Sequence, residues 1–157
     1  MTDWLFSLES TGFATWLRES GSIWAYPLVL TLHTAGMGVL VGANWVLDLR
    51  FLGVATGVPL ASIQRLFRVM WAGFWVNLAT GVMLFAADAS TKGATRLFVF
   101  KIGLVILAVL VAAGMQRRVY GSGDEPTAVP SGVPALAALS IVLWLGAIAA
   151  GRYMAYV

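Results

Sequence analysis

The feature that most constrains the fold is a set of four long apolar segments. They cover residues 23–47, 66–87, 97–115 and 135–153, and each is near the roughly 20 residues that a helix needs to cross the hydrocarbon core of a bilayer. Of the 157 residues, 60% are hydrophobic and only 11% are charged. A soluble domain of this size could not bury that much apolar surface. The sequence therefore predicts a multi-pass protein whose surroundings are lipid.

The pattern within these segments indicates the fold class. In lipid every backbone N–H and C=O must be satisfied within the protein, which leaves helices and closed barrels. None of the four segments alternates polar and apolar residues as a barrel strand does. We therefore expect an all-α integral membrane four-helix bundle, forming a single membrane domain over residues 1–157.

The stretch before the first apolar segment predicts a different kind of helix. Residues 2–19 mix aromatic residues such as Trp4, Phe13 and Trp16 with charged ones. This composition is typical of an amphipathic helix that lies at the membrane surface, with tryptophans as interface anchors. The domain should thus begin with an N-terminal interfacial helix.

Lysines and arginines near the segment ends predict the orientation. One side of the membrane would hold Arg50, Arg65, Arg68, Arg117 and Arg118. The other side would hold Arg18, Lys92, Arg96 and Arg152. The excess on the first side predicts a protein of the bacterial inner membrane with both termini in the periplasm. On the cytoplasmic side, Asp48 should pair with Arg50, Arg65 or Arg68. The sequence has no basic patch with interleaved aromatic residues, so we do not expect it to bind nucleic acid.

The strongest candidate for a functional residue is His33, the only histidine in the chain. It lies near the middle of the first apolar segment, where an ionisable side chain is costly and usually has a function. Successive helical residues differ by about 100°, so Tyr26, His33 and Asn44 share one helix face. A polar face in a membrane helix points toward the bundle interior.

The depth of His33 can be matched to the other segments. With a rise of about 1.5 Å per residue, the residues expected at the same level are Thr80, Gly81, Gly103, Trp144 and Gly146. Lys101 should lie about one turn nearer the outside. The four helices would thus collect a histidine, several glycines and a cation in one region.

This set of residues favours heme over other uses of a membrane histidine. A porphyrin is flat and apolar and carries two propionates, so glycines would give it room and a cation would pair with a propionate. We therefore expect a b-type heme whose iron is bound by His33, with Thr80 and Gly81 lining the pocket and Lys101 pairing a propionate. A second axial ligand would come from a residue such as Met83 or from a second subunit.

Two alternatives remain open. Copper would be handled by His33 with the thioethers of Met37 and of Met70 or Met83, a ligand set that suits Cu(I). In the other alternative, His33 only forms a hydrogen bond to Thr80 or Asn77 across helices. The chain would then be a non-catalytic subunit or assembly partner of a membrane complex.

Several short motifs also resemble known families. The stretch LHTAGMGVLVG at 32–42, followed by LDLRFLG at 47–53, resembles a family of small uncharacterised bacterial membrane proteins, and later segments within 71–102 look similar. More distantly, the pattern is similar to the membrane protoporphyrinogen oxidase family and to copper-resistance D-type membrane proteins. In the oxidase family a first-helix histidine is followed by an arginine, and a later helix opens with a lysine; His33, Arg50 and Lys101 match these positions.

The resemblance implies a b-type heme on His33 and porphyrin or quinone redox chemistry. We therefore expect a membrane protein of electron transfer, a membrane oxidoreductase. Its partners would be the lipid bilayer, a redox protein or quinone, and further subunits in a homo-oligomer or larger complex.

Overall fold

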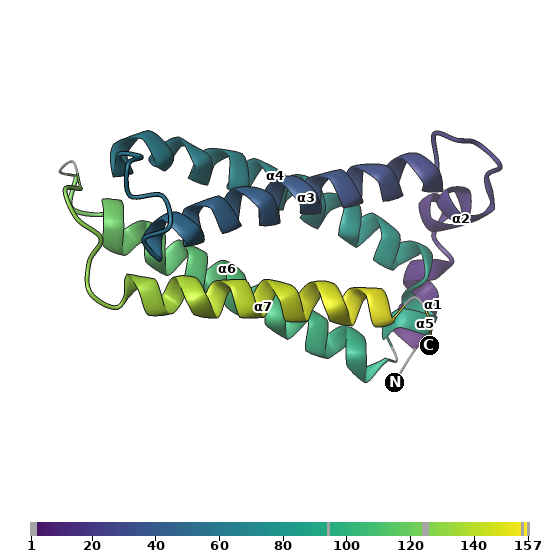
Figure 1. Ribbon diagram of the computed structural model, residues 1–157. Coiled ribbons are helices and arrows are strands. Elements are labelled where there is room, and N and C mark those ends of the chain that lie inside the picture. The colour runs from purple at the N-terminus through teal and green to yellow at the C-terminus, as the bar shows by residue number, and fades with distance from the viewer. Residues whose placement is uncertain (1–2, 94, 124–125, 155, 157) are drawn as a thin grey trace.

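The chain folds as an all-α bundle, as expected. The structure is a computed structural model that describes residues 3–93, 95–123, 126–154 and 156. Among these residues it contains helices and no strand, and four of the helices are long and apolar enough to cross a membrane. They are α3 (Tyr26–Phe51), α4 (Leu60–Ala87), α6 (Arg96–Tyr120) and α7 (Val133–Tyr153). The protein is thus a multi-pass membrane protein of the bundle type (Figure 1).

The spanning helices are longer than the apolar segments that predicted them. The α4 helix begins at Leu60, directly after Pro59, and so includes Arg65, which precedes the predicted segment 66–87. The α6 helix likewise continues beyond Met115 to Tyr120. Long cationic side chains can extend along the helix to the membrane surface, so an arginine ends an apolar run without ending the helix.

The prediction of one continuous interfacial helix over residues 2–19 is wrong, because the segment is broken into two helices. Residue 2 lies outside the described residues. Two short helices are present, α1 (Asp3–Glu9) and α2 (Gly12–Glu19). The break occurs because Thr11 caps α2: its side chain accepts a hydrogen bond from Ala14 N at 3.4 Å. A further short helix, α5 (Ala89–Gly93), lies between α4 and α6.

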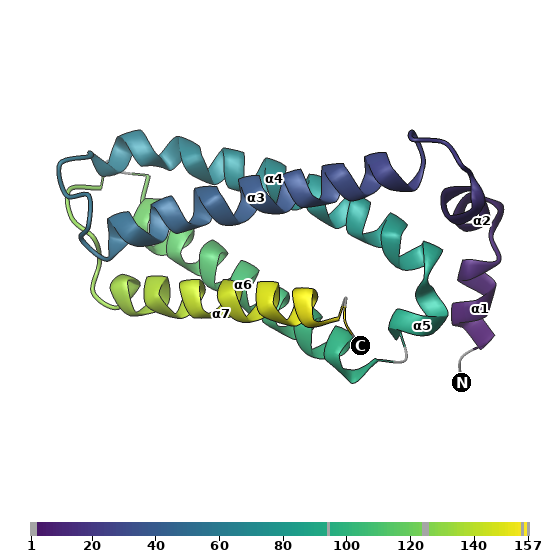
Figure 2. The same ribbon diagram turned by 45° about the vertical axis from the view of Figure 1, so that its right-hand side comes forward.

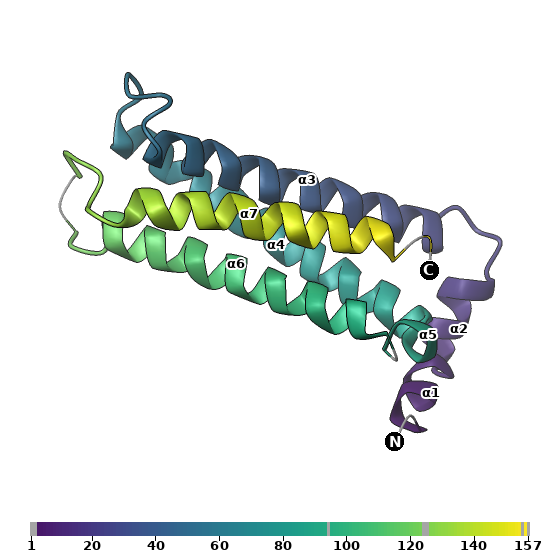
Figure 3. The ribbon, with the colours of Figure 1, turned by 60° about the horizontal axis from the view of Figure 1, so that its bottom comes forward.

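The spanning helices form two hairpins that are contiguous in sequence, α3–α4 and α6–α7. The α7 helix lies between α3 and α6 and joins the two hairpins (Figure 3). Within the first hairpin the backbones approach closely at Gly36 and Gly73. A Cβ atom added at Gly73 would lie 2.7 Å from Leu40 N and 3.0 Å from Gly36 O. Glycine at both positions permits this crossing, as small residues do in many membrane bundles.

The hairpins share a core at only one end. The large buried cluster lies at the end of the bundle where the α3–α4 and α6–α7 loops are. All four spanning helices contribute to it, for example from Leu40 to Phe51 on α3 and from Val133 to Trp144 on α7. A smaller cluster at the opposite end is formed by residues of α2, α3 and α4, such as Leu17 and Val29, and by Ala25 directly before α3. Toward that end the α3–α4 and α6–α7 hairpins spread apart (Figures 1 and 2).

The short helices pack against the spread end of the bundle. Glu9 of α1 accepts hydrogen bonds from Ser90 N and from Arg18 of α2, each at 3.0 Å. Arg18 also donates to the carbonyl of Ala87, 3.2 Å away at the end of α4. These contacts hold α1 and α2 across one end of the α3–α4 hairpin, while the side chain of Trp16 stays exposed.

Candidate functional site

His33 is held by the facing helix α4. Its Nδ1 lies 3.0 Å from the carbonyl oxygen of Asn77 and 3.1 Å from the Thr80 hydroxyl oxygen. In return, the Asn77 side-chain amide donates to the carbonyl of His33 at 2.8 Å. The imidazole is therefore fixed in position by reciprocal hydrogen bonds between α3 and α4.

These contacts determine which ring nitrogen carries the proton. A backbone carbonyl can only accept a hydrogen bond, so Nδ1 of His33 must be the donor to Asn77. The Thr80 hydroxyl donates its own hydrogen to the carbonyl of Val76 at 2.7 Å and can therefore also accept from Nδ1. The other nitrogen, Nε2, keeps its lone pair.

The Nε2 atom of His33 is also accessible. No hydrogen bond joins it to any residue that the structure describes. It is not among the buried side-chain atoms that lack a partner, so part of its surface is open. A neutral imidazole with a free, accessible Nε2 can bind a metal ion or a heme iron.

Gly81 allows the imidazole to lie against α4. A Cβ atom at this position would be 3.1 Å from His33 Cε1 and 3.5 Å from Nδ1. The structure thus brings together His33, Thr80 and Gly81, three of the four residues that the sequence proposed for one pocket.

The α6–α7 part of the proposed layer does not reach His33 in the same way. A Cβ atom at Gly103 would meet nothing within 4 Å, whereas one at Gly146 would meet Leu104 at 3.2 Å. Trp144 is buried in the large core cluster. The side chain of Lys101, a residue of α6, lies against α7, and its Cε is 3.4 Å from a Cβ built on Gly151. Equal depth did not bring these groups into contact because the two hairpins spread apart at this end.

The methionines expected for copper lie in apolar clusters. Met70 is buried in the large core and Met37 packs against it, while Met83 packs against the smaller cluster. Within the described ranges, no three His, Cys, Asp or Glu side chains gather into a group that could hold a metal ion. In the part of the chain that the structure describes, His33 is therefore not joined by a group of imidazole, thiolate or carboxylate ligands around one ion.

A second polar cluster was not foreseen. The Asn44 amide nitrogen lies 2.6 Å from Asp48 Oδ2 and 2.8 Å from Ser140 Oγ, and all three residues are 0% exposed. The predicted ion pairing of Asp48 with arginine is wrong: Arg50 instead donates to the carbonyls of Val58 and Thr56. The sequence signal for this polar cluster was the spacing of Asn44 and Asp48, which lie four residues apart on one face of an apolar helix.

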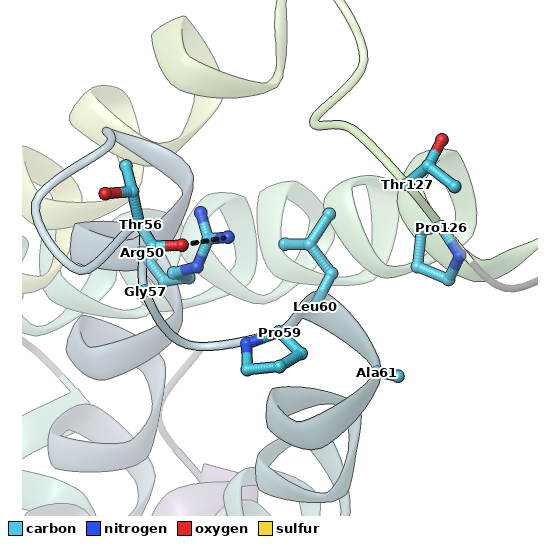
Figure 4. Close-up of a pocket in the computed structure, with 8 residues that line it drawn as sticks. All are labelled: Arg50, Thr56, Gly57, Pro59, Leu60, Ala61, Pro126 and Thr127. Atoms are coloured by element: carbon cyan, nitrogen blue, oxygen red, sulfur yellow. Dashed lines mark hydrogen bonds between the residues drawn. The ribbon is translucent and has the colours of Figure 1, made fainter.

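Two open hollows lie at the loop end of the bundle. One, of about 340 Å³, is bordered by the α3–α4 loop, and Figure 4 shows the Arg50 guanidinium bonded to the neighbouring Thr56 carbonyl among its lining residues. The other, of about 500 Å³, lies between α4 and α6, where Trp71 Nε1 donates to Gln116 Oε1 at 2.8 Å. Neither hollow is lined by a histidine, an aspartate or a glutamate, so neither presents a site comparable to His33.

Comparisons with known proteins do not assign these residues. No protein-family model, curated protein or solved structure matches the chain. The functional reading therefore depends on the contacts of His33 with α4 and on the buried Asn44, Asp48 and Ser140.

Proposed function

We propose that the protein binds a b-type heme through Nε2 of His33 and takes part in membrane electron transfer or redox chemistry. The observation that carries the proposal is the bond from Nδ1 to the Asn77 carbonyl. Histidines that bind metals almost always donate their other N–H to a carbonyl, a carboxylate or water, which fixes the tautomer and orients the ring. His33 has this arrangement.

The surroundings of His33 support an apolar cofactor rather than a hydrated ion. The residue lies in a membrane-spanning helix, and heme iron needs only an imidazole on its proximal side. When bound, the heme would supply one-electron transfer. His33 would hold it, Thr80 and Gly81 would set the ring orientation, and Lys101 would pair with a propionate. The resemblance to the membrane protoporphyrinogen oxidase family implies the same ligand and the same lysine.

The visible absorption spectrum of the purified protein tests the proposal. After expression with ample heme, we expect a Soret band from the wild type and its loss in His33→Ala. A colourless wild-type protein would refute the proposal, and bound copper without a Soret band would favour the copper alternative.

A matched pair of glycine variants tests the position of the ring. Gly81→Ala places a methyl group 3.1 Å from His33 Cε1 and should shift or weaken the Soret band, whereas Gly103→Ala meets nothing within 4 Å and should leave it unchanged. Equal spectra from both variants would show that the heme is not bound at His33.

The same hydrogen bonds favour a second candidate function. If the contacts from His33 to Asn77 and Thr80 serve only to hold α3 on α4, the chain is a non-catalytic subunit or assembly partner of a membrane complex. In that case the wild type would show no Soret band, while His33→Ala would still lower the stability of the bundle. The spectrum and an unfolding measurement on the same two samples separate the two functions.

A further inference from the structure

The fully buried carboxyl group of Asp48 has no cationic partner in the described part of the chain. The ion pairs found there involve Glu9, Glu19 and Asp88, and none involves Asp48. A buried carboxylate without a partner is strongly unfavourable, and it normally takes up a proton instead.

The charged groups on the surrounding helices do not compensate it. On α3, the guanidinium of Arg50 is bonded to the carbonyls of the following loop. The arginines at this end of α4 and α6 are exposed: Arg65, Arg68, Arg117 and Arg118. On α7, the group that contacts the cluster is the uncharged hydroxyl of Ser140.

The distances within the cluster indicate where a proton would lie. The Asn44 amide nitrogen lies 2.6 Å from Asp48 Oδ2, a distance that also falls within the 2.5–3.0 Å of an O–H···O bond. The Asn44 amide can turn over in the same space, which would bring its oxygen toward Asp48 and Ser140. A protonated Asp48 and the Ser140 hydroxyl would then both donate to that oxygen.

An unpaired oxygen at the same place also favours the neutral acid. Oδ1 of Asp48 is buried and has no hydrogen-bond partner among the described residues. An ionised carboxylate would carry part of its negative charge on such an unpaired oxygen. A neutral acid leaves only a weakly polar oxygen there, at lower cost.

We propose that Asp48 is a proton-binding site inside the bundle, neutral at pH 7, with its proton donated to Asn44 and the hydroxyl of Ser140 as the third member. The site lies three residues before the end of α3 at Phe51, or about 4.5 Å along the helix axis. This proposal does not depend on heme binding at His33.

Infrared spectroscopy of the protein in lipid vesicles at neutral pH tests the site. We expect one carboxylic-acid C=O band that shifts when the aspartates carry ¹³C and shifts again on transfer to D₂O. The band should disappear in Asp48→Asn and persist in Asp88→Asn, whose carboxylate is partly exposed and pairs with Lys92 at 3.3 Å. Absence of an aspartic-acid band in the wild type, or a band that survives in Asp48→Asn, would overturn the proposal.

A second variant keeps the test decisive if Asp48→Asn does not fold. Ser140→Ala removes one donor to the Asn44 oxygen, so the acid band should move in frequency while remaining present. A band that is the same in Ser140→Ala and wild type would place the protonated aspartate elsewhere. A wild-type band that appears only when sodium or potassium is removed would show that the site binds a cation, and this would also overturn the proposal.

Discussion

The close backbone contact between α3 and α4 leads to a sharp prediction for Gly73→Ala. The added Cβ would lie 2.7 Å from Leu40 N, about 0.7 Å short of the 3.4 Å at which ordinary contact begins. Its next neighbours are Gly36 O and Leu40 Cα, which are also backbone atoms. No side chain can rotate away, so α3 and α4 must move apart.

The cost should correspond to overpacking of a rigid contact. Such insertions typically cost about 1–3 kcal/mol, and each 1.4 kcal/mol is about tenfold in the unfolding equilibrium. Gly36→Ala should cost less, since one of its near neighbours is the movable Val76 side chain, at 3.1 Å. Gly42→Ala, on the same helix as Gly36, is the matched control. A Cβ atom at Gly42 would meet nothing within 4 Å, so this variant should lose no stability.

Unfolding in mixed micelles of a mild detergent and increasing dodecyl sulfate, followed by circular dichroism, measures this series. We expect the midpoint to be lowest for Gly73→Ala, intermediate for Gly36→Ala, and at or above the wild-type value for Gly42→Ala. If Gly73→Ala unfolds at the same midpoint as Gly42→Ala, the two helices are not held at the described crossing.

Three other predictions concern the ends of the bundle. Hydrogen bonds from Ser90 hold the pKa of Glu9 below its ordinary value. Docking of α1 should therefore be favoured at a pH above the usual glutamate pKa and lost as the pH falls through the lowered pKa. Tryptophan fluorescence should report this change, and Glu9→Gln should abolish it. Tyr120→Phe removes the 2.9 Å bond to a carbonyl at the start of α4 and should cost about 0.5–1.5 kcal/mol of stability in the same micelle assay; an unchanged midpoint would contradict that bond. The chain has no cysteine, so Thr56→Cys and Lys92→Cys should react with a membrane-impermeant maleimide from opposite sides of a vesicle, and labelling from one side only would exclude four crossings.

The membrane helices were predictable because lipid leaves few choices. Apolar length and backbone satisfaction determine that a segment such as 97–115 crosses the membrane as a helix. The end of α6 at Tyr120 was less predictable, because Arg117 and Arg118 continue the helix while their charges reach the surface. Hydropathy detects the crossing but not the polar turns at its ends.

Contacts within a hairpin were more predictable than contacts between hairpins. The pairing of His33 with Thr80 and Gly81 follows from the rise per residue along two adjacent antiparallel helices. Ser140, in contrast, is 96 residues from Asn44. Its contact depends on which face of α7 meets α3, and depth alone does not specify that face.

The order of the hairpins along the chain has a consequence for how the protein is made. Each hairpin consists of two neighbouring helices and a short loop, so α3–α4 can enter the membrane before α6–α7 leaves the ribosome. The shared core then forms when the second hairpin docks at the loop end. A chain divided between α5 and α6 and expressed as two fragments should therefore reassemble in the same membrane, with each fragment supplying one complete hairpin.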